Sequence, residues 1–359
     1  EETEKKLDME ITVEKCPSNA DNRQAKISTI LASGDKNIDL ISVNDEMISE
    51  FKHKGYLEPL EKNVMTEEVR DSFPQKYLES ICEENGHIYS VPFQMDIMMF
   101  WVNQELLKQA GLDEIKNTGD FDILQKSLKN PDQYAYGDAW ENTHVYNSLS
   151  QFVNFWGGDY FDWTDPKTKD AARYMKSMLD EKNTSPAQFV DQYEQMEEKF
   201  IRGKYGCVFM YTSALGTFLD ADVYGKNKIH MAPLPVLHKK KATNIATWQY
   251  VLNNASENKD AAVRFLQYAA GYEGSTEYAK IMKSYPARVD VIENEDIDLE
   301  GIDMIRKYLR EYTLNARPLC ENSMGAVSDM GKLFQGYVLG QCEEDSFFEQ
   351  AQNCINTYY

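Results

Sequence analysis

The most apolar run of the chain lies at residues 88–102 and reads IYSVPFQMDIMMFWV, which is typical of a buried strand. It carries Asp96 in its middle and soon changes into an amphipathic helix, ELLKQAGL. Burying an unpaired carboxylate would cost several kcal/mol, so Asp96 needs a partner. Two interpretations stay open: a hydrogen-bonded structural carboxylate that caps the turn of a neighbouring element, or a side chain that faces a ligand.

Strand and helix patterns alternate through the first hundred residues. The alternation predicts strands around Ile11 and Val13 and at 37–43, NIDLISV, each followed by a helix-like segment that ends in glycine. Strand–helix–strand order of this kind predicts an α/β protein with a parallel sheet covered by helices.

The ends of the predicted strands are where binding chemistry is expected. Ligands of open α/β sheets sit beyond the carboxyl ends of the strands, and Asn44 and Asp45 follow NIDLISV at once. Asp45 has a second interpretation as the N-cap of the next helix. Tyr211 and Ser213 follow the predicted strand YGCVFM in the same way.

Beyond the first hundred residues the pattern becomes helix-rich. Residues 185–204 predict one long helix, because Phe189, Tyr193, Met196 and Phe200 repeat at helical spacing and are expected to face the core. The other predicted elements are strands at 205–211 and 248–254, a helix at 258–271, and a helical closing stretch from residue 299.

Length and charge narrow the class of protein. A chain of 359 residues exceeds the size of most single hydrophobic cores, so we expect two domains. Its net charge of -21 makes favourable contact with a phosphate backbone improbable, so nucleic acid is not an expected partner. The sequence has no apolar run of 18 or more residues that could span a bilayer.

The cysteines and histidines give no sign of a metal site. Six cysteines are spread along the chain without a CxxC pair, and five histidines form no HExxH pair. A disulfide between Cys342 and Cys354 is left open. We expect no metal and no cofactor.

Short segments along the whole chain resemble, in the right order, landmarks of the extracellular solute-binding proteins of ABC importers, in the sugar-binding group that includes maltose-binding protein. The matching segments are ILASGDKNIDLISVND, GYLEPL, NGHIYSVPF, MMFWVNQELLKQAGL, FWGGDYF, EEKFIRGKYGCVFM, NNASENKDAAVRFLQYAAGYEG, YPARVDV and ARPLCENS. The resemblance implies two α/β lobes, each a sheet flanked by helices, joined by strands that cross between them. It assigns residues 1–97 and 253–300 to the first lobe, and 98–252 and 301–359 to the second.

The resemblance also implies a function and a location. Such a protein captures a monosaccharide or oligosaccharide in an interlobe cleft by hinge closure and delivers it to the membrane permease, without catalysis. The family pattern implies that the natural precursor extends upstream of Glu1, with an export signal and a lipid-modified cysteine. We therefore expect a monomer on the surface of a Gram-positive-type cell or in a periplasm.

A sugar site needs directional hydrogen-bonding side chains and flat aromatic platforms. The residues chosen by position or resemblance are Asn44, Asp45, Asp96, Trp140, Glu141, Trp156, Tyr211, Ser213, Trp248 and Arg288. Most have a structural alternative: core packing for the aromatic residues, a helix cap for Trp140 and Glu141, and a surface or interlobe ion pair for Arg288.

Two other functions stay open at this stage. A glycoside hydrolase would need two flanking carboxylates, and 59 acidic residues make such a pair easy to imagine without supporting it. Signatures of a nucleophile elbow, a P-loop or a zinc protease are absent from the sequence. The same fold with a polyamine, peptide or other solute is the main alternative, since Asp45, Asp96 and Glu141 would suit a polycation.

Overall fold

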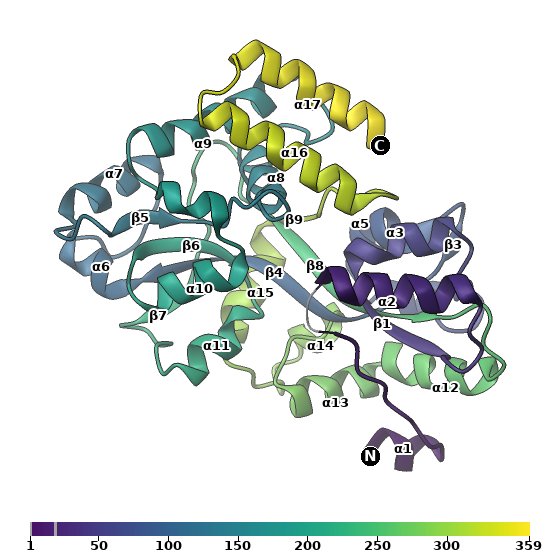
Figure 1. Cartoon of the computed structure of the whole chain (residues 1–359). Coiled ribbons are helices and arrows are strands. Elements are labelled where there is room, and N and C mark those ends of the chain that lie inside the picture. The colour runs from purple at the N-terminus through teal and green to yellow at the C-terminus, as the bar shows by residue number, and fades with distance from the viewer. Residues whose placement is uncertain (1, 18–19) are drawn as a thin grey trace. The chain divides into compact units, whose positions relative to one another are not determined.

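The computed structural model describes residues 2–17 and 20–359 and separates into two compact units. Unit 1 comprises Glu1–Met95 and Ala246–Glu300, and unit 2 comprises Asp96–Ile245 and Gly301–Tyr359. Two long strands, β4 (Val91–Asn103) and β8 (Ala242–Leu252), each run from one unit into the other (Figure 1). The sequence had placed these two changes of unit after residues 97 and 252.

Unit 1 is a small sheet with helices around it. Strand β1 (Leu40–Asn44) pairs antiparallel with β8, so that Leu40 lies opposite Leu252 and Asn44 opposite Trp248. Figure 1 shows α2 on one side of β1 and α12 on the other. The other elements of unit 1 are α1 (Glu2–Leu7), α2 (Ala20–Ser33), α3 (Asp45–His53), α4 (Glu67–Arg70), α5 (Gln75–Tyr77), a π-helical turn (Leu78–Cys82), β2 (Glu83–Glu84), β3 (His87–Ile88), α12 (Lys259–Ala270), α13 (Tyr272–Met282) and α14 (Val289–Glu293).

Two expectations for this unit are wrong. Residues 9–17 form no strand, and Val13 is 78% exposed, since a short alternation of apolar and polar residues becomes a strand only where a partner strand is available. The pairing of β1 is antiparallel rather than parallel, because its partner β8 arrives from a distant part of the sequence. Glu1, the first residue of the predicted first lobe, lies outside the described residues.

Unit 2 contains a mixed sheet. Strand β6 (Tyr205–Tyr211) runs parallel to β5 (Tyr134–Gly137) and antiparallel to β4, which also pairs with β7 (Ile229–Ala232). Strand β9 (Thr313–Ala316) pairs parallel with the first residues of β8. The helices are α6 (Gln104–Gln109), α7 (Thr118–Ser127), α8 (Val145–Trp156), α9 (Pro166–Asp180), α10 (Tyr193–Ile201), α11 (Ala214–Asp220), α15 (Ile302–Glu311), α16 (Ser323–Val338) and α17 (Glu344–Tyr358), with a 3-10 helix at Pro186–Val190.

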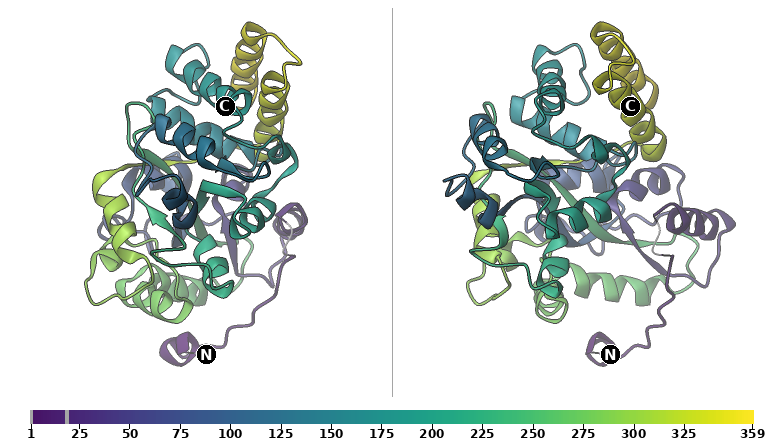
Figure 2. Two further views of the ribbon diagram at one scale, coloured as in Figure 1. Left: turned by 90° about the vertical axis from the view of Figure 1, so that its left-hand side faces the viewer. Right: turned by 60° about the vertical axis from the view of Figure 1, so that its left-hand side comes forward.

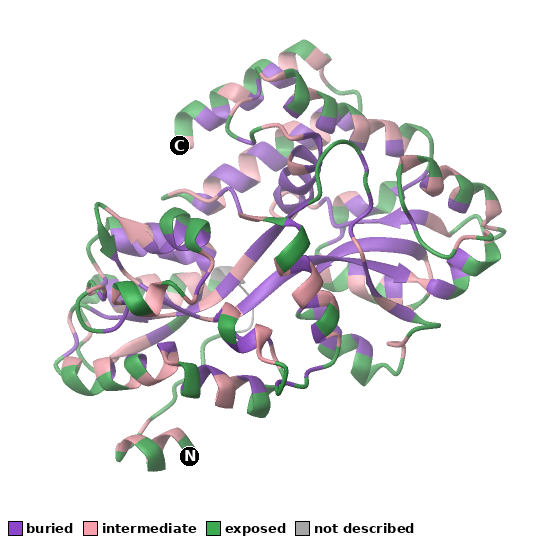
Figure 3. Ribbon diagram, turned by 180° about the vertical axis from the view of Figure 1, so that it is seen from behind, coloured by how far each residue is buried: buried purple, intermediate pink, exposed green. Residues whose placement is uncertain are grey.

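An aromatic cluster forms the centre of unit 2. Tyr136, Phe152, Phe155 and Phe209 are buried, and their contacting rings have centroids 5.4 to 6.1 Å apart. These residues link β5, α8 and β6, so the cluster fixes the second half of α8 relative to β6. Most of β4 and all of β6 are buried, as the purple strands of Figure 3 show, and in Figure 2 the C-terminal helices α16 and α17 lie against each other.

The predicted helix at 185–204 is wrong in its first half. Residues Pro186–Val190 form a short 3-10 helix instead of an α-helix, and the backbone carbonyls of Gln188 and Asp191 accept hydrogen bonds from the amides of Trp140 (2.8 Å) and Glu141 (3.2 Å). Helix α10 starts afresh at Tyr193. The predictions for β6, α12 and the α/β fold class are confirmed.

All six cysteines are free, so Cys342 and Cys354 form no disulfide. Strand β9 interrupts the closing stretch that had been predicted to be helical. Among residues 2–17 and 20–359, no helix is both long and apolar enough to cross a bilayer.

Candidate ligand-binding site

Asp96 lies beside the turn that follows β6. In the β4–β6 ladder Met98 lies opposite Tyr211, so Asp96 lies beside Thr212 and Ser213, the two residues that follow β6. The hydroxyl of Thr212 donates to Asp96 Oδ1 (2.7 Å), and the amide of Ser213 donates to the same oxygen (2.9 Å). Asp96 is only 8% exposed, and these bonds explain how β4 tolerates a carboxylate.

The carboxylate of Asp96 keeps binding capacity. Both of these hydrogen bonds end on Oδ1, and the hydroxyl of Ser213 also lies close enough to the carboxylate to lower its pKa, which leaves acceptor capacity on Oδ2. Burial raises the pKa of Asp96 above its usual range, while hydrogen bonds from Thr212 and Ser213 and the charge of Arg317 act in the opposite direction. Oδ2 is therefore available to accept a hydrogen bond from a ligand hydroxyl.

Aromatic rings stand close to this carboxylate. Tyr211, the last residue of β6, stacks on Tyr193 of α10 with ring centroids 5.9 Å apart and planes 23° apart. The hydroxyl of Tyr211 donates to Asn147 Oδ1 on α8 (3.0 Å). The guanidinium of Arg317 lies 5.9 Å from the ring centres of both Tyr211 and Tyr146 and donates to the Tyr146 hydroxyl (2.6 Å).

The first turns of α8 are held in place by a buried amide network. Asn244 of β8 donates through Nδ2 to the carbonyl of Asn147 (3.2 Å) and to the hydroxyl of Ser150 (2.8 Å). Its backbone amide donates to Gln151 Oε1 (3.0 Å). Because these bonds are buried and mutually supporting, the partner of Tyr211 has a fixed position.

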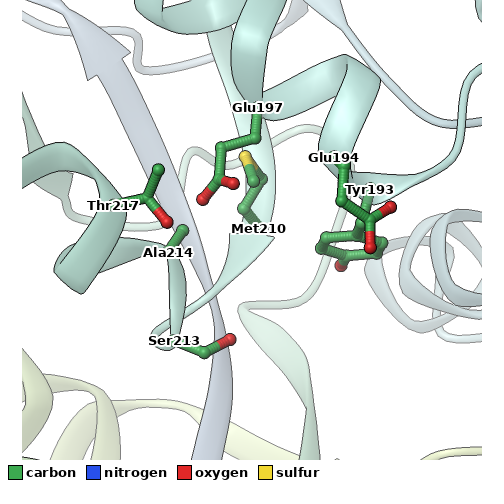
Figure 4. A pocket seen from close by; sticks show the side chains of 7 residues that line it. All are labelled: Tyr193, Glu194, Glu197, Met210, Ser213, Ala214 and Thr217. Atoms are coloured by element: carbon green, nitrogen blue, oxygen red, sulfur yellow. The ribbon is translucent and has the colours of Figure 1, made fainter. Parts of the chain in front are cut away.

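A hollow of about 260 Å³ opens next to the Tyr193 ring (Figure 4). Its lining residues are Tyr193, Glu194, Glu197, Met210, Ser213, Ala214 and Thr217. Figure 4 shows the carboxyl group of Glu197 directed towards Thr217. Burial raises the pKa of Glu197 above its usual range, the Thr217 hydroxyl opposes that rise, and the nearby charge of Glu194 adds to it. The lining set contains two carboxylates and no lysine or arginine.

Trp140 has a buried position in unit 2. It is 0% exposed, its indole N–H donates to Asp138 Oδ2 (2.9 Å), and it packs against Phe189 and Phe334. A ring enclosed in this way offers no face to a ligand, so we leave Trp140 out of the proposed ligand-binding set.

Glu141 and Trp156 also have partners within unit 2. Glu141 Oε2 accepts hydrogen bonds from the amide (3.0 Å) and hydroxyl (2.7 Å) of Thr143, as a cap would. Burial raises its pKa, but the Thr143 and His144 hydrogen bonds outweigh that effect and lower the pKa below its usual range. Trp156 stacks on His238 with ring centroids 5.0 Å apart. Neither residue is part of the cluster around Asp96 that the hydrogen bonds define.

Of the residues predicted in unit 1, Asp45 has a structural partner, whereas Asn44 and Trp248 keep capacity to contact a ligand. Asp45 is fully buried and accepts a hydrogen bond from the Tyr77 hydroxyl (3.0 Å), which favours a structural role. Asn44 lies opposite Trp248 in the β1–β8 ladder. Asn44 Oδ1 is buried and, within the described part of the chain, has no hydrogen-bond partner. The half-buried Trp248 ring has the guanidinium of Arg23 5.3 Å from its centre.

Arg288 joins separate segments of unit 1. It donates to both carboxylate oxygens of Asp290 (3.0 and 2.6 Å), to the hydroxyl of Ser72 (2.7 Å) and to the carbonyl of Ala270 (2.8 Å). This set of bonds matches the ion-pair alternative and leaves little donor capacity for a ligand.

The structure therefore adds residues that the sequence patterns missed. Tyr193 had been assigned to a core stripe, and Asn147, Tyr146 and Arg317 had not been selected. Arg317 lies within the segment ARPLCENS, which carried part of the family resemblance and could have identified it. No local pattern distinguishes Asn147 or Tyr146 from other residues at a helix start.

Comparison with known proteins places the chain in a family. Residues 4–276 match the family model of bacterial extracellular solute-binding proteins. The chain is 22% identical over 286 residues to the arabinooligosaccharide-binding protein of Bacillus subtilis, covering 76% of this chain and 65% of that protein. It is 24% identical over 239 residues to a probable amino-acid ABC transporter periplasmic-binding protein of Sinorhizobium fredii, covering 63% and 54%. The chain thus spans about half to two thirds of the length of these relatives.

Solved structures agree with this assignment at the level of the fold. Maltose-bound MalE3 of T. maritima superposes with a TM-score of 0.80 at 17% identity and covers 99% of this chain and 96% of its own. The sugar-binding protein MalE of Xanthomonas citri gives a TM-score of 0.82 at 16% identity, covering 99% and 92%. A solute-binding protein of Thermotoga lettingae bound with alpha-D-tagatose gives 0.80 at 18% identity, covering 94% and 89%. The predicted resemblance is confirmed: the chain belongs to the bacterial extracellular solute-binding proteins.

Proposed function

We propose that this protein is the solute-binding component of an ABC importer, that it binds a monosaccharide or oligosaccharide, and that it delivers this ligand to a membrane permease. The observation that carries the proposal is the arrangement around Asp96. One carboxylate oxygen is anchored by Thr212 and Ser213, the other has acceptor capacity, and the stacked rings of Tyr193 and Tyr211 are close by.

This arrangement matches what a sugar presents. A hydroxyl can donate to Asp96 Oδ2, and the flat C–H face of a pyranose or furanose can lie on an exposed part of the Tyr193 ring. Maltose and tagatose, bound by structural neighbours, and the arabinooligosaccharide of one relative offer both features, while mannitol and ribitol, bound by other neighbours, are open-chain polyols that offer the hydroxyl groups alone. Binding of this kind makes and breaks no covalent bond.

From unit 1 we propose Asn44 and Trp248 as ligand contacts. The two residues are paired across β1 and β8, and the unsatisfied Asn44 Oδ1 has capacity for a donor. Replacing Trp248 by alanine should weaken binding at least tenfold, which corresponds to about 1.4 kcal/mol. Isothermal titration calorimetry measures this change, and an unaltered Kd would remove Trp248 from the site.

One observation favours a second class of ligand. The hollow beside Tyr193 is lined by Glu194 and Glu197 without a basic residue, which suits a cationic solute such as a polyamine. The charge of Glu194 disfavours ionisation of Glu197, and a cation bound in the hollow would offset that repulsion.

A titration panel separates the two classes. We would titrate the protein by calorimetry with arabinooligosaccharides, maltooligosaccharides, ribitol, mannitol and spermidine, and repeat each titration with Asp96→Asn. The matched control is Asp220→Asn, an exposed residue at the end of α11. Saturable binding of one glycan series that Asp96→Asn weakens and Asp220→Asn leaves unchanged supports the proposal. Binding of spermidine alone would replace the sugar by a polyamine.

The family and the resemblance support a proposed location outside the cell. The family is extracellular, and we propose attachment to the outer surface of the cell membrane through a lipid anchor upstream of this sequence, and action as a monomer. Fractionation of cells that produce the natural protein, with and without lipase treatment, tests the anchor. Light scattering of the purified chain tests the monomer.

A further inference from the structure

The loop between β7 and β8 carries four consecutive residues that are exposed and basic or titratable: His238, Lys239, Lys240 and Lys241. We call them the basic loop, and all of them belong to unit 2 (Figure 1). In a chain with 38 basic and 59 acidic residues, three adjacent lysines are a marked local reversal of charge.

The basic loop is anchored to the folded unit. The amides of Lys239 and Lys240 donate to the carbonyl of Phe155 at the end of α8 (3.2 and 3.1 Å). The His238 ring stacks on Trp156 with planes 2° apart. The carbonyl of Lys241 accepts a hydrogen bond from the amide of Thr313 (3.1 Å). These contacts hold the lysine backbones in place, so the charges are presented together.

The ammonium groups of the loop lack acidic partners. Within residues 2–17 and 20–359, no carboxylate lies within 4.0 Å of Lys239, Lys240 or Lys241. Lys241 Nζ lies 5.5 Å from the ring centre of Tyr312. The negative end of the α8 dipole can stabilise a positive charge only within the last turn of the helix. It therefore explains one nearby lysine but not three exposed ones.

An apolar residue stands at the head of the loop. Val236 is 44% exposed, and its amide is held by the carbonyl of Lys116 (2.7 Å). The next residue, Leu237, is buried. An exposed apolar side chain beside a cluster of lysines is the composition of segments that contact the headgroup region of anionic bilayers.

We propose that the basic loop and Val236 form a contact surface for the anionic lipid headgroups of a membrane. Acidic groups farther than about 8–10 Å from the lipid are screened at physiological ionic strength, so the local lysines decide the interaction. The net charge of -21 would repel other faces of the protein, so this loop would orient unit 2 at the bilayer. An acidic protein segment could pair with the same lysines, and the test below distinguishes it from lipid.

The test is co-sedimentation of the full chain with vesicles of phosphatidylcholine alone or with about one third phosphatidylglycerol. The variant K239Q/K240Q/K241Q removes the charges of the loop. The control K62Q/K76Q/K129Q removes three other exposed lysines and gives the same net charge. Each lysine near an anionic surface changes the partition coefficient about fivefold, so the loop variant should lose at least tenfold and the control less than twofold.

Further measurements distinguish lipid headgroups from an acidic protein segment as the partner. Raising the salt concentration should release the protein from anionic vesicles, and Val236→Ser should weaken binding further at constant charge. Equal partition into neutral and anionic vesicles would overturn the proposal, as would equal losses in the two triple variants. Binding of an acidic peptide without vesicle binding would overturn it too. Sugar titrations of the loop variant are expected to be unchanged, because the loop shares no contact with Asp96.

Discussion

Replacing Asp138 by alanine should strongly destabilise unit 2. The buried carboxylate of Asp138 accepts hydrogen bonds from the hydroxyls of Tyr136 (2.6 Å) and Ser148 (2.6 Å), the indole of Trp140 (2.9 Å) and the amide of Ala139 (2.8 Å). Alanine would leave these buried donors unpaired, at about 1–3 kcal/mol each. Some water would enter the vacated space, so we expect a loss of about 4 kcal/mol of unfolding free energy.

Urea denaturation followed by circular dichroism measures this loss. Ser148→Ala is the matched control, because it removes one donor and leaves the carboxylate with three, and it should cost about 1.5 kcal/mol. In the Asp138→Ala background the same change should cost nothing, since the hydroxyl no longer has an acceptor. The cycle should therefore show a coupling of at least 1 kcal/mol.

The reasoning fails if Asp138→Ala unfolds within 1 kcal/mol of the wild type, or if the two changes are additive. Either result would mean that the donors find other partners at little cost. If the alanine variant does not fold, Asp138→Asn provides the measurement, because its amide keeps one acceptor oxygen and should lose about half as much.

Three other predictions follow from single features. The hydrogen bond from Arg173 lowers the pKa of Glu344, so the pair contributes stability above the ordinary glutamate pKa and loses it as pH falls through the lowered value. Both side chains are about 40% exposed, so Glu344→Gln should cost less than about 1 kcal/mol at neutral pH and nothing in strong acid, as chemical denaturation across pH would show. At Gly331 of α16 a Cβ would lie 2.0 Å from the carbonyl oxygen of Asn142, so Gly331→Ala should lower the unfolding free energy by about 1–3 kcal/mol. Gly336→Ala on the same helix should not lower it. An equal fall in melting temperature for the two variants would contradict this prediction. If the protein closes on its ligand as the family resemblance implies, small-angle scattering should give a smaller radius of gyration with saturating sugar than without, and an unchanged radius would rule out closure.

Local patterns were sufficient for much of the fold. The strand at Tyr205–Tyr211 and the helix at Lys259–Ala270 were predicted because apolar periodicity and flanking turn residues agree there. The strand at residues 11–13 failed because pairing depends on partners that no local pattern contains. The single long helix predicted at 185–204 is broken into a 3-10 helix and α10, because the carbonyls of Gln188 and Asp191 are bonded to the distant residues 140 and 141.

The candidate site was only partly accessible from the sequence. Asp96 stood out because a carboxylate in an apolar strand requires an explanation, and Tyr211 because it ends a strand. Arg317 and Asn147 come from segments far apart in the chain, and their contacts with Tyr211 depend on tertiary packing alone. For Trp140 the composition of the segment was equally suitable for a sugar platform and for a core, and only burial distinguishes them.

The six unpaired thiols affect how the chain can be produced and chemically labelled. Because all six cysteines are free, folding requires no oxidation step, and production in a reducing cytoplasm suits it. Cys16 is exposed on a segment without regular structure, whereas Cys82 and Cys207 are buried. Burial raises the pKa of Cys82 to about 12, so its thiolate is scarce at neutral pH. A maleimide dye would thus react with Cys16 before these buried thiols, and replacing the half-buried Cys320 and Cys342 would leave Cys16 as a labelling position for single-molecule or immobilisation experiments.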